Sequence, residues 1–283
     1  MRATWPIRRS DAGLLVGFYV AMTLLWTGIG ALIKHSSDGT ALGNADRDIE
    51  EWLVERRTPS RNTLSLVGSM LSETAIKIVV TAIVGVVLLW LLRRWFETLV
   101  IAVSLIIEAM IFMTVTLIVA RPRPDVPRLD ESPVSTSFPS GHVAAAACYG
   151  AMAVVLFWHT RRFWLRAMAV FLTLAIPTAV GVARMYRGMH YLTDVVGGAI
   201  IGAMCVVAVT WILKRAEARR LDEGTVLGPM KFDVRSAEYS DLPSSVAGRA
   251  GPNYSRSNRS RFMTFSQALT KSLANFSLAS SEA

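Results

Sequence analysis

Residues 78–92 read IVVTAIVGVVLLWLL, a run that no charged side chain interrupts. A helix of this length in a soluble protein normally carries a polar stripe that faces water. Because this run has none, it indicates a helix surrounded by lipid. The chain is 52% hydrophobic, and six stretches approach the roughly 20 apolar residues that cross a bilayer: about 13–33, 75–92, 97–120, 142–158, 165–183 and 191–213. The sequence therefore predicts an all-α, polytopic membrane protein with a bundle of six transmembrane helices.

The basic residues indicate how the chain is inserted. The formal net charge is +9, but most Lys and Arg lie at the ends of the apolar stretches, so no nucleic-acid partner is expected. Cytoplasmic loops favour such residues, and the first span usually sets the orientation. Arg2, Arg8 and Arg9 precede the first span and place the N terminus in the cytoplasm. With six spans, both termini of this multi-pass cell-membrane protein are expected there.

A membrane domain is predicted at residues 1–213, with a long outer loop at about 34–73. In this loop Ile49, Trp52 and Leu53 recur at helical spacing, with charged residues opposite. They predict a helix that either lies along the outer membrane interface or covers the bundle.

The composition of residues 214–283 predicts a cytoplasmic, mostly disordered tail, because its serine, glycine and scattered charges cannot bury a core. One part differs. Within residues 259–276, apolar residues recur at steps of three and four with basic residues around them, which predicts an amphipathic helix that rests on the anionic inner leaflet.

Unusual polar residues flank four of the spans. They follow the third span, open the fourth, close the fifth and open the sixth: Arg121 and Arg123; Ser140 and His142; Arg184; His190 and Asp194. The end of an odd span and the start of the next even span lie on the same membrane face. Connectivity therefore predicts that all these side chains meet at one surface.

The residue types in these clusters suit a phosphoryl group. The planar guanidinium matches phosphate oxygens, so Arg123 and Arg184 are predicted to neutralise the group from two sides. Ser140 and the Gly141 amide open a helix, where free N–H groups and the helix dipole attract anions. Gly141 is expected to let the backbone approach the anion closely.

Two histidines are predicted to perform the reaction. His190 and Asp194 are four residues apart and hence neighbours on a helical face. A carboxylate on one ring nitrogen would fix the tautomer of His190 and leave the other nitrogen free to attack phosphorus. The ordinary pKa of a histidine side chain lies near neutrality. This suits His142 to act as an acid that protonates the leaving oxygen and as a base that later deprotonates water.

The spacing of His190 and Asp194 would also permit a metal ion. A metal would need further acidic or histidine ligands, whereas the neighbouring residues are arginines that already supply positive charge. The sequence predicts no metal and no cofactor.

These residues closely resemble the pattern of the type 2 phosphatidic acid phosphatase (PAP2) superfamily, which shares its active site with the vanadium haloperoxidases. The pattern is KxxxxxxRP, PSGH and SRxxxxxHxxxD. Here it corresponds to Arg123 with Pro124, to residues 139–142, and to Arg184, His190 and Asp194. The resemblance covers residues 45 to 213. It implies a six-helix membrane lipid phosphatase that acts without metal through a phosphohistidine at His190, with its site at the outer leaflet.

The sequence departs from that pattern twice. Thr116 stands where the family has its lysine, and Ala183 stands where it has its serine. Arg121 and Lys77 are the candidates to supply the missing cation to the phosphate. We therefore expect Arg121 to bind substrate.

The expected substrate is a phosphate ester or diphosphate on a lipid that enters from the bilayer. Polyprenyl diphosphate is favoured; phosphatidate and phosphatidylglycerol phosphate also qualify. A transporter is a second hypothesis, suggested by Glu108, Lys77 and Pro177 within or near the spans. A third is a catalytically inactive lipid-binding relative, suggested by Thr116 and Ala183.

Overall fold

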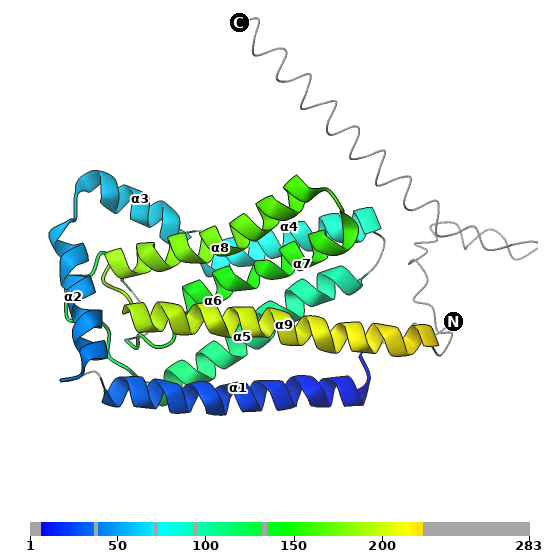
Figure 1. Ribbon diagram of the computed structural model, residues 1–283, viewed down its shortest axis with the longest axis horizontal. Helices are drawn as coiled ribbons and strands as arrows, with labels where there is room; N and C mark the ends of the chain where they lie inside the picture. The colour runs from blue at the N-terminus through cyan, green and yellow to red at the C-terminus, as the bar shows by residue number, and fades with distance from the viewer. Residues whose placement is uncertain (1–6, 37–38, 71–72, 93–94, 132–134, 223–283) are drawn as a thin grey trace, which may run out of the picture. The chain divides into compact units, whose positions relative to one another are not determined.

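The computed structural model describes residues 7–36, 39–70, 73–92, 95–131 and 135–222 (Figure 1). Within these ranges every named element is a helix: α1 (Arg9–His35), α2 (Ala41–Glu55), α3 (Pro59–Met70), α4 (Thr74–Leu92), α5 (Phe96–Val119), α6 (Gly141–Cys148), α7 (Gly150–His159), α8 (Phe163–Tyr186) and α9 (Leu192–Asp222). Six helical stretches are long and apolar enough to cross a membrane, with α6 and α7 together forming one of them. The predicted all-α architecture with six spans is confirmed.

The chain divides into two compact units. Residues 1–86 and 95–227 form the first unit. The helix packing and the site described below lie within this unit. Of the second unit, the structure describes the last residues of α4.

Close packing of α6 against α9 aligns their N-terminal ends. A Cβ atom on Gly198 would overlap the carbonyl oxygen of Ser140, and one on Gly202 would overlap that of Ala144. Small residues of this kind let membrane helices approach until their backbones touch. As a result, the backbone N–H of Ser140 donates to the carbonyl oxygen of Asp194 at 3.0 Å. The starts of the two helices are thereby fixed side by side.

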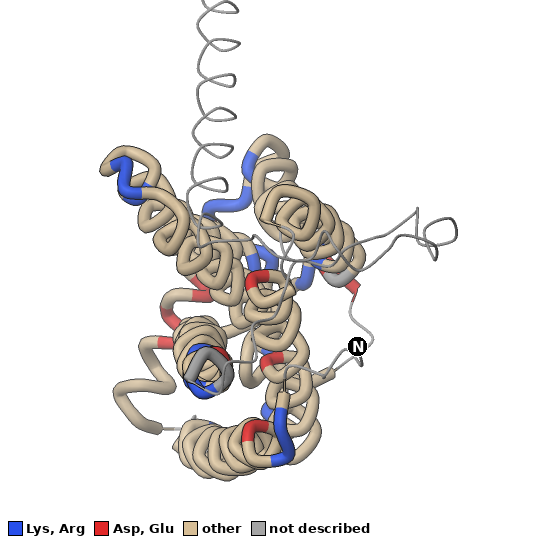
Figure 2. Tube along the Cα trace, turned by 90° about the vertical axis from the view of Figure 1, so that its right-hand side faces the viewer, with Lys and Arg blue, Asp and Glu red and all other residues tan. Residues whose placement is uncertain are grey.

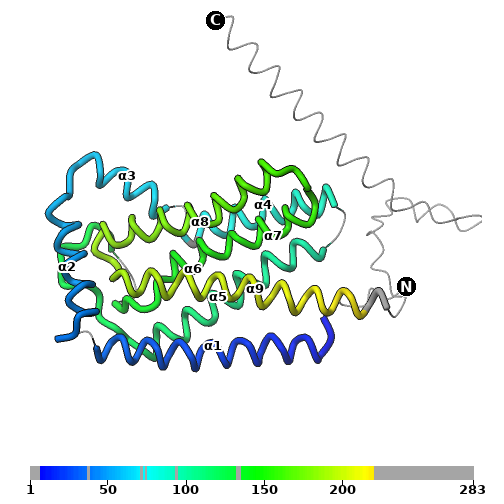
Figure 3. Tube along the Cα trace, in the orientation of Figure 1, coloured from blue at the N-terminus to red at the C-terminus, as the bar shows by residue number. Residues whose placement is uncertain are grey.

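The polar clusters predicted from the sequence lie at one end of the bundle. Figures 1 and 3 show the C-terminal ends of α5 and α8 beside the N-terminal ends of α6 and α9, at the end where α2 and α3 lie. Figure 2 looks onto the opposite end, where Lys and Arg gather at helix ends. Because successive spans alternate in direction, the polar clusters lie at one end of the bundle and the basic helix ends lie at the other.

The helix predicted in the outer loop exists as α2, but its buried face carries acids besides the expected Ile49 and Leu53, which are half-buried. Asp46 and Glu50 are buried on it, whereas Trp52 is 53% exposed. The reason is that Asp46 accepts hydrogen bonds from Thr193 and Arg121, so a polar face is turned toward the bundle. α2 packs on α8 and α9. Of the two arrangements considered for this helix, it covers the bundle.

α9 extends beyond the predicted end of the membrane domain. It continues to Asp222, so the boundary placed after residue 213 falls inside a helix. Arg219 in this extension forms an ion pair with Asp11 of α1, which ties the extension to the bundle. Most of the predicted tail, including the amphipathic helix expected at 259–276, lies outside the described residues.

Candidate active site

His190 lies in the short connection between α8 and α9. Its side chain is 3% exposed, and its Nδ1 atom is 2.8 Å from the carbonyl oxygen of Ser137. A carbonyl can only accept a hydrogen bond, so Nδ1 carries the proton of the neutral ring. Nε2 is therefore the nitrogen with an available lone pair. This is the tautomer that a nucleophilic imidazole needs.

Asp194 lies close to His190, as predicted, but the predicted hydrogen bond between them is not formed. α9 begins only at Leu192, so His190 lies before the helix and the two residues do not share a helical face. Nδ1 of His190 is 3.9 Å from Oδ2 of Asp194, which is too long for a hydrogen bond. The Ser137 carbonyl fixes the tautomer instead.

The carboxylate of Asp194 has two other partners. Oδ2 accepts the backbone N–H of Tyr191 at 2.9 Å, as an acid in the first turn of a helix does in a capping box. Oδ1 accepts a hydrogen bond from Nη1 of Arg121 at 2.6 Å. Asp194 thus fixes the start of α9 and places its negative charge behind the imidazole of His190.

The electrostatic surroundings keep His190 neutral. Burial lowers the pKa of its imidazole well below the ordinary value, and the positive charges of Arg184 and Arg123 and the nearby His142 lower it further. Because an uncharged ring is the nucleophilic form, His190 remains competent across the neutral range. The charges of these residues therefore act on the imidazole of His190.

Two buried polar atoms of the predicted site residues have no partner in the described part of the chain. They are the hydroxyl oxygen of Ser140 and the Nε atom of Arg184. Ser140 is the residue before α6, yet its side chain does not cap that helix. Buried polar groups almost always have a hydrogen-bond partner, so each exception needs an explanation. An oxyanion bound at the start of α6 would satisfy both atoms.

Gly141 is required for a reason that the sequence did not reveal. A Cβ atom at this position would lie 2.7 Å from ring atoms of Phe112 on α5. The missing side chain therefore allows α6 to begin directly against that ring. The first N–H groups of α6 have no acceptor within their own helix and are thereby held in place for an anion.

Arg123 secures the loop between α5 and α6. Its Nη1 atom donates to the carbonyl oxygen of Met189 at 2.5 Å, next to His190 in the chain. This contact brings its positive charge to the imidazole of His190, as the effect on the pKa of that ring shows.

Arg121 has the contacts of a residue that positions other side chains. It is 2% exposed, and its Nη1 and Nη2 atoms donate to Asp194 at 2.6 Å and to Asp46 at 3.0 Å. Nη1 also donates to Thr193 at 2.7 Å. Protein acceptors hold both terminal nitrogens, which differs from the expected role of Arg121 as a phosphate ligand.

Sequence reasoning missed Asp46. Its carboxylate accepts from Arg121, from the backbone N–H of Thr193 at 3.1 Å, and from the hydroxyl of Thr193 at 2.5 Å. The charged residues of α2 were expected to face away from the buried side, because helical periodicity assigns apolar residues to the core. No local pattern distinguishes Asp46 from its exposed neighbour Asp48.

Glu50 is a second buried carboxyl group on α2. It is 1% exposed, and neither of its oxygens has a hydrogen-bond partner within the described ranges. Burial and the negative charge of Asp194 raise its pKa to about 9, against the opposing charge of Arg57. Glu50 is therefore protonated in the folded protein at neutral pH.

Replacing Glu50 with Gln is expected to stabilise the protein at neutral and alkaline pH. The carboxyl group ionises near pH 4.5 when the chain unfolds and only near pH 9 when it is folded. The unfolded state thus binds fewer protons between these values, so wild-type stability falls as pH rises through this window. At pH 7 the gain from Glu50→Gln should be on the order of 3 kcal/mol.

Thermal unfolding in detergent at pH 5 and pH 8 tests this expectation. The midpoint difference between Glu50→Gln and wild type should be small at pH 5 and larger at pH 8. Glu51→Gln, at an exposed position on the same helix, is the matched control. Equal shifts at both pH values would show that Glu50 does not titrate in this way.

The position of the missing family lysine holds no cation. Thr116 is buried in α5, and its hydroxyl lies 3.0 Å from that of Thr136. Lys77 of α4 is half-buried, and its charge acts on His142. Arg121 and Lys77 were the two candidates to replace the missing cation. Among the described contacts, Lys77 is the one of the two that makes no hydrogen bond to a carboxylate.

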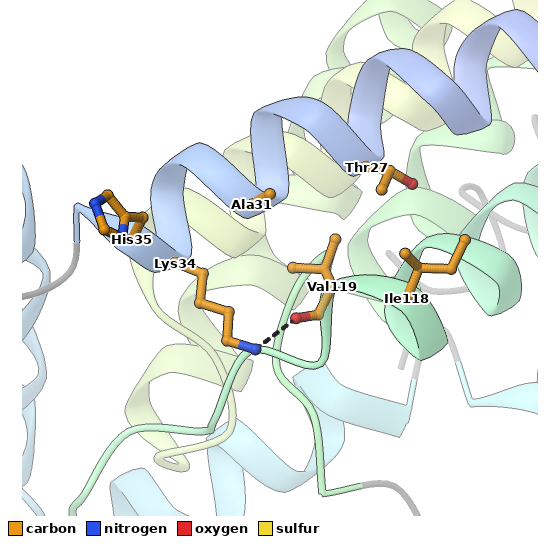
Figure 4. Close-up of a pocket in the computed structure, with 6 residues that line it drawn as sticks. All are labelled: Thr27, Ala31, Lys34, His35, Ile118 and Val119. Atoms are coloured by element: carbon orange, nitrogen blue, oxygen red, sulfur yellow. Dashed lines mark hydrogen bonds between the residues drawn. The ribbon is translucent and has the colours of Figure 1, made fainter.

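Among the described residues, no three His, Cys, Asp or Glu side chains form a group that could hold a metal ion. A cavity of about 490 Å³ opens between α1 and α5, where Lys34 donates to the carbonyl oxygen of Val119 at 2.9 Å (Figure 4). None of the predicted catalytic residues lines this cavity, so it is separate from the cluster around His190.

The sequence of this region also matches a known family. Residues 97–218 match the PAP2 superfamily. Residues 97–218 therefore form a PAP2 segment. The matched PAP2 segment contains every predicted catalytic and phosphate-binding residue, from Arg121 to Asp194.

Two curated relatives and one solved structure are similar to this PAP2 protein. It is 32% identical to the bacitracin transport permease protein BcrC of Bacillus licheniformis over 31% of this chain and 39% of that relative. It is 29% identical to phosphatidylglycerophosphatase B of Bacillus subtilis over 58% of this chain and 81% of that relative. The crystal structure of a transmembrane PAP2-type phosphatidylglycerolphosphate phosphatase from Bacillus subtilis matches with a TM-score of 0.61 and 25% identity, covering 70% of this chain and 96% of that chain.

These matches and the apolar spans identify a multi-pass membrane protein that carries a PAP2 segment. The chain spans less than half the length of the BcrC relative and about four fifths of the phosphatidylglycerophosphatase.

Proposed function

We propose that this PAP2 protein is a lipid phosphatase that acts through a phosphohistidine at His190. One observation carries the proposal: two unpartnered buried polar atoms, on Ser140 and Arg184, lie with a neutral imidazole whose Nε2 is available. Together they offer a nucleophile and a cradle for the oxygens of a phosphoryl group.

The proposed reaction has two steps. In the first, Nε2 of His190 attacks phosphorus, the bond to the lipid oxygen breaks, and His142 gives its proton to that oxygen. In the second, His142 takes a proton from water, whose oxygen attacks phosphorus and breaks the P–N bond. Inorganic phosphate leaves and the neutral imidazole returns. The negative charge of Asp194 favours the positively charged phosphoimidazole formed between the steps.

The arrangement of the spans supports entry of the substrate from the bilayer. The site lies at the end of the bundle that carries α2 and α3, while the basic helix ends gather at the opposite end (Figures 1 and 2). Because basic residues favour the cytoplasmic side, we place the site at the outer leaflet and the N terminus in the cytoplasm. The acyl or prenyl tails then remain in the membrane during the reaction.

The relatives favour phosphatidylglycerol phosphate as the first substrate to test. One relative and one solved structure carry that activity in their names. Polyprenyl diphosphate, the substrate favoured by the sequence alone, and phosphatidate complete the set. All three present a terminal phosphoryl group that the same cradle would bind.

Purified protein in detergent should release phosphate from these lipids, with the highest kcat/KM for phosphatidylglycerol phosphate. Release should be unchanged in excess EDTA, because arginines rather than a metal supply the positive charge. Orthovanadate should inhibit, since a trigonal phosphate mimic resembles the transition state. Loss of activity in EDTA that added Mg²⁺ restores would contradict metal independence.

Transport is the second candidate function. It is favoured by Glu108, which is buried within α5 with one carboxyl oxygen unpartnered among the described residues, and by the name of the BcrC relative. Transporters bind substrate near the membrane midplane, whereas the His190 cluster lies at span ends. Phosphate release by wild type but not by His190→Ala separates the enzyme from both a transporter and an inactive lipid-binding relative.

A further inference from the structure

Arg184 uses one nitrogen for protein contacts and leaves one edge open. Nη1 donates to the hydroxyl of Ser69 at 2.9 Å and to Oδ2 of Asp130 at 3.0 Å. Since Nη1 has two hydrogens, both are engaged. Nε is buried without a partner in the described part of the chain, and no hydrogen bond of Nη2 is found there. The Nε–Nη2 edge is thus available to a ligand.

Asp130 is held firmly in the loop between α5 and α6. Its Oδ2 accepts from Nε of Arg187 at 2.7 Å, and its Oδ1 accepts from Nη2 of the same guanidinium. Arg187 in turn donates to the carbonyl oxygen of Asn62 and the hydroxyl of Ser65, each at 3.1 Å, on α3. The carboxylate is therefore fixed by a bidentate ion pair that is anchored to another helix.

Asp130 is ionised in this position. Burial acts to raise its pKa, but the hydrogen bond and charge of Arg187 and the charge of Arg184 hold the pKa below its ordinary value. An ionised carboxylate on Nη1 keeps the guanidinium of Arg184 in one orientation. A charge-assisted hydrogen bond of this kind is about twice as strong as a neutral one.

We propose that Asp130 is a positioning residue: it occupies Nη1 of Arg184 and thereby presents the Nε–Nη2 edge to two oxygens of the phosphoryl group. The two parallel N–H bonds of that edge match two oxygens of a phosphate. The inference rests on the proposed phosphatase function. It adds a residue outside the family pattern to the binding of phosphate.

Asp130→Ala is expected to lower kcat/KM for the lipid phosphate by about tenfold to a hundredfold, the range for a hydrogen bond to a charged group. The dissociation constant of orthovanadate should rise by a similar factor, because Arg184 contacts the phosphate mimic directly. Asp130→Asn keeps an acceptor for Nη1 and should lose less. Asp125→Ala, at an exposed acid in the same loop, should match wild type.

A double-mutant cycle tests whether Asp130 acts through Arg184. If it does, adding Asp130→Ala to Arg184→Ala should change kcat/KM by no more than about twofold, since interacting residues are not additive. Fully additive losses would assign Asp130 a general structural role. A wild-type or smaller vanadate dissociation constant in Asp130→Ala would also overturn the proposal, because it would mean that the carboxylate is inert or competes with the anion.

Two measurements keep this test decisive. Thermal unfolding reports whether each variant is folded. If Asp130→Ala is not folded, unchanged kcat/KM and unchanged vanadate binding in both Asp130→Asn and Asp130→Ser would overturn the inference. Vanadate binding is measured by calorimetry and needs no turnover. Wild type without lipid phosphatase activity would therefore refute the proposed function, whereas the Asp130 inference is judged by vanadate binding alone.

Discussion

Replacing His190 with Ala should abolish phosphate release from the lipid, with a fall in kcat of about 10⁴-fold or more, as for other covalent nucleophiles. The reason is that the proposed reaction forms a bond between Nε2 and phosphorus, and no other side chain around the cradle can replace that nitrogen. Substrate binding should persist, because Ser140 and Arg184 remain. Phosphate release from purified protein measures the loss of turnover. Vanadate binding to the same variant measures whether the phosphate-binding groups still bind an anion.

The covalent intermediate can be detected directly. Rapid quenching in alkaline denaturant, in which the P–N bond of phosphohistidine persists, after mixing with lipid labelled at its terminal phosphorus should leave no label on His190→Ala, while wild type carries label. His142→Ala should both gain and lose label more slowly than wild type, because it lacks the proton transfers of both steps. His35→Ala, an exposed histidine at the end of α1, is the control and should behave as wild type. Wild-type turnover by His190→Ala would end the mechanism.

Replacing Arg121 with Ala should destabilise the protein by about 3–5 kcal/mol, the usual cost of removing one partner from a buried ion pair. Two buried carboxylates, Asp46 and Asp194, would lose the guanidinium to which both are bonded. Arg121→Lys should recover little, since one ammonium group cannot reproduce a planar fork between two acids. Turnover should fall as well, because Asp194 then loses the hydrogen bond that fixes its carboxylate.

Thermal unfolding in detergent and kcat/KM for the best substrate measure these two effects. Arg128→Ala, at an exposed arginine of the same loop, should retain the stability and activity of wild type. If Arg121→Ala kept both as well, Arg121 would have no part in the site. A loss of activity without any loss of stability would return Arg121 to the expected role of a phosphate ligand.

Local sequence properties sufficed for the membrane architecture. The uninterrupted apolar runs, such as residues 78–92, require helices in lipid because a bilayer offers no other partner for the backbone. The order of the spans then placed Arg123, Ser140, Arg184 and His190 at one end of the bundle, since a chain that crosses a membrane alternates between its faces. These residues could therefore be named without coordinates.

Only the tertiary structure decided which atoms those residues contact. Ser137 lies 53 residues from His190, Asp46 lies 75 from Arg121, and Ser69 lies 115 from Arg184. Periodicity relates residues within one helix, so it placed His190 and Asp194 on a shared face although α9 begins between them. It also assigned the acids of α2 to the exposed side. Hydrogen-bond partners drawn from distant segments depend on how the helices pack, and no local pattern encodes that packing.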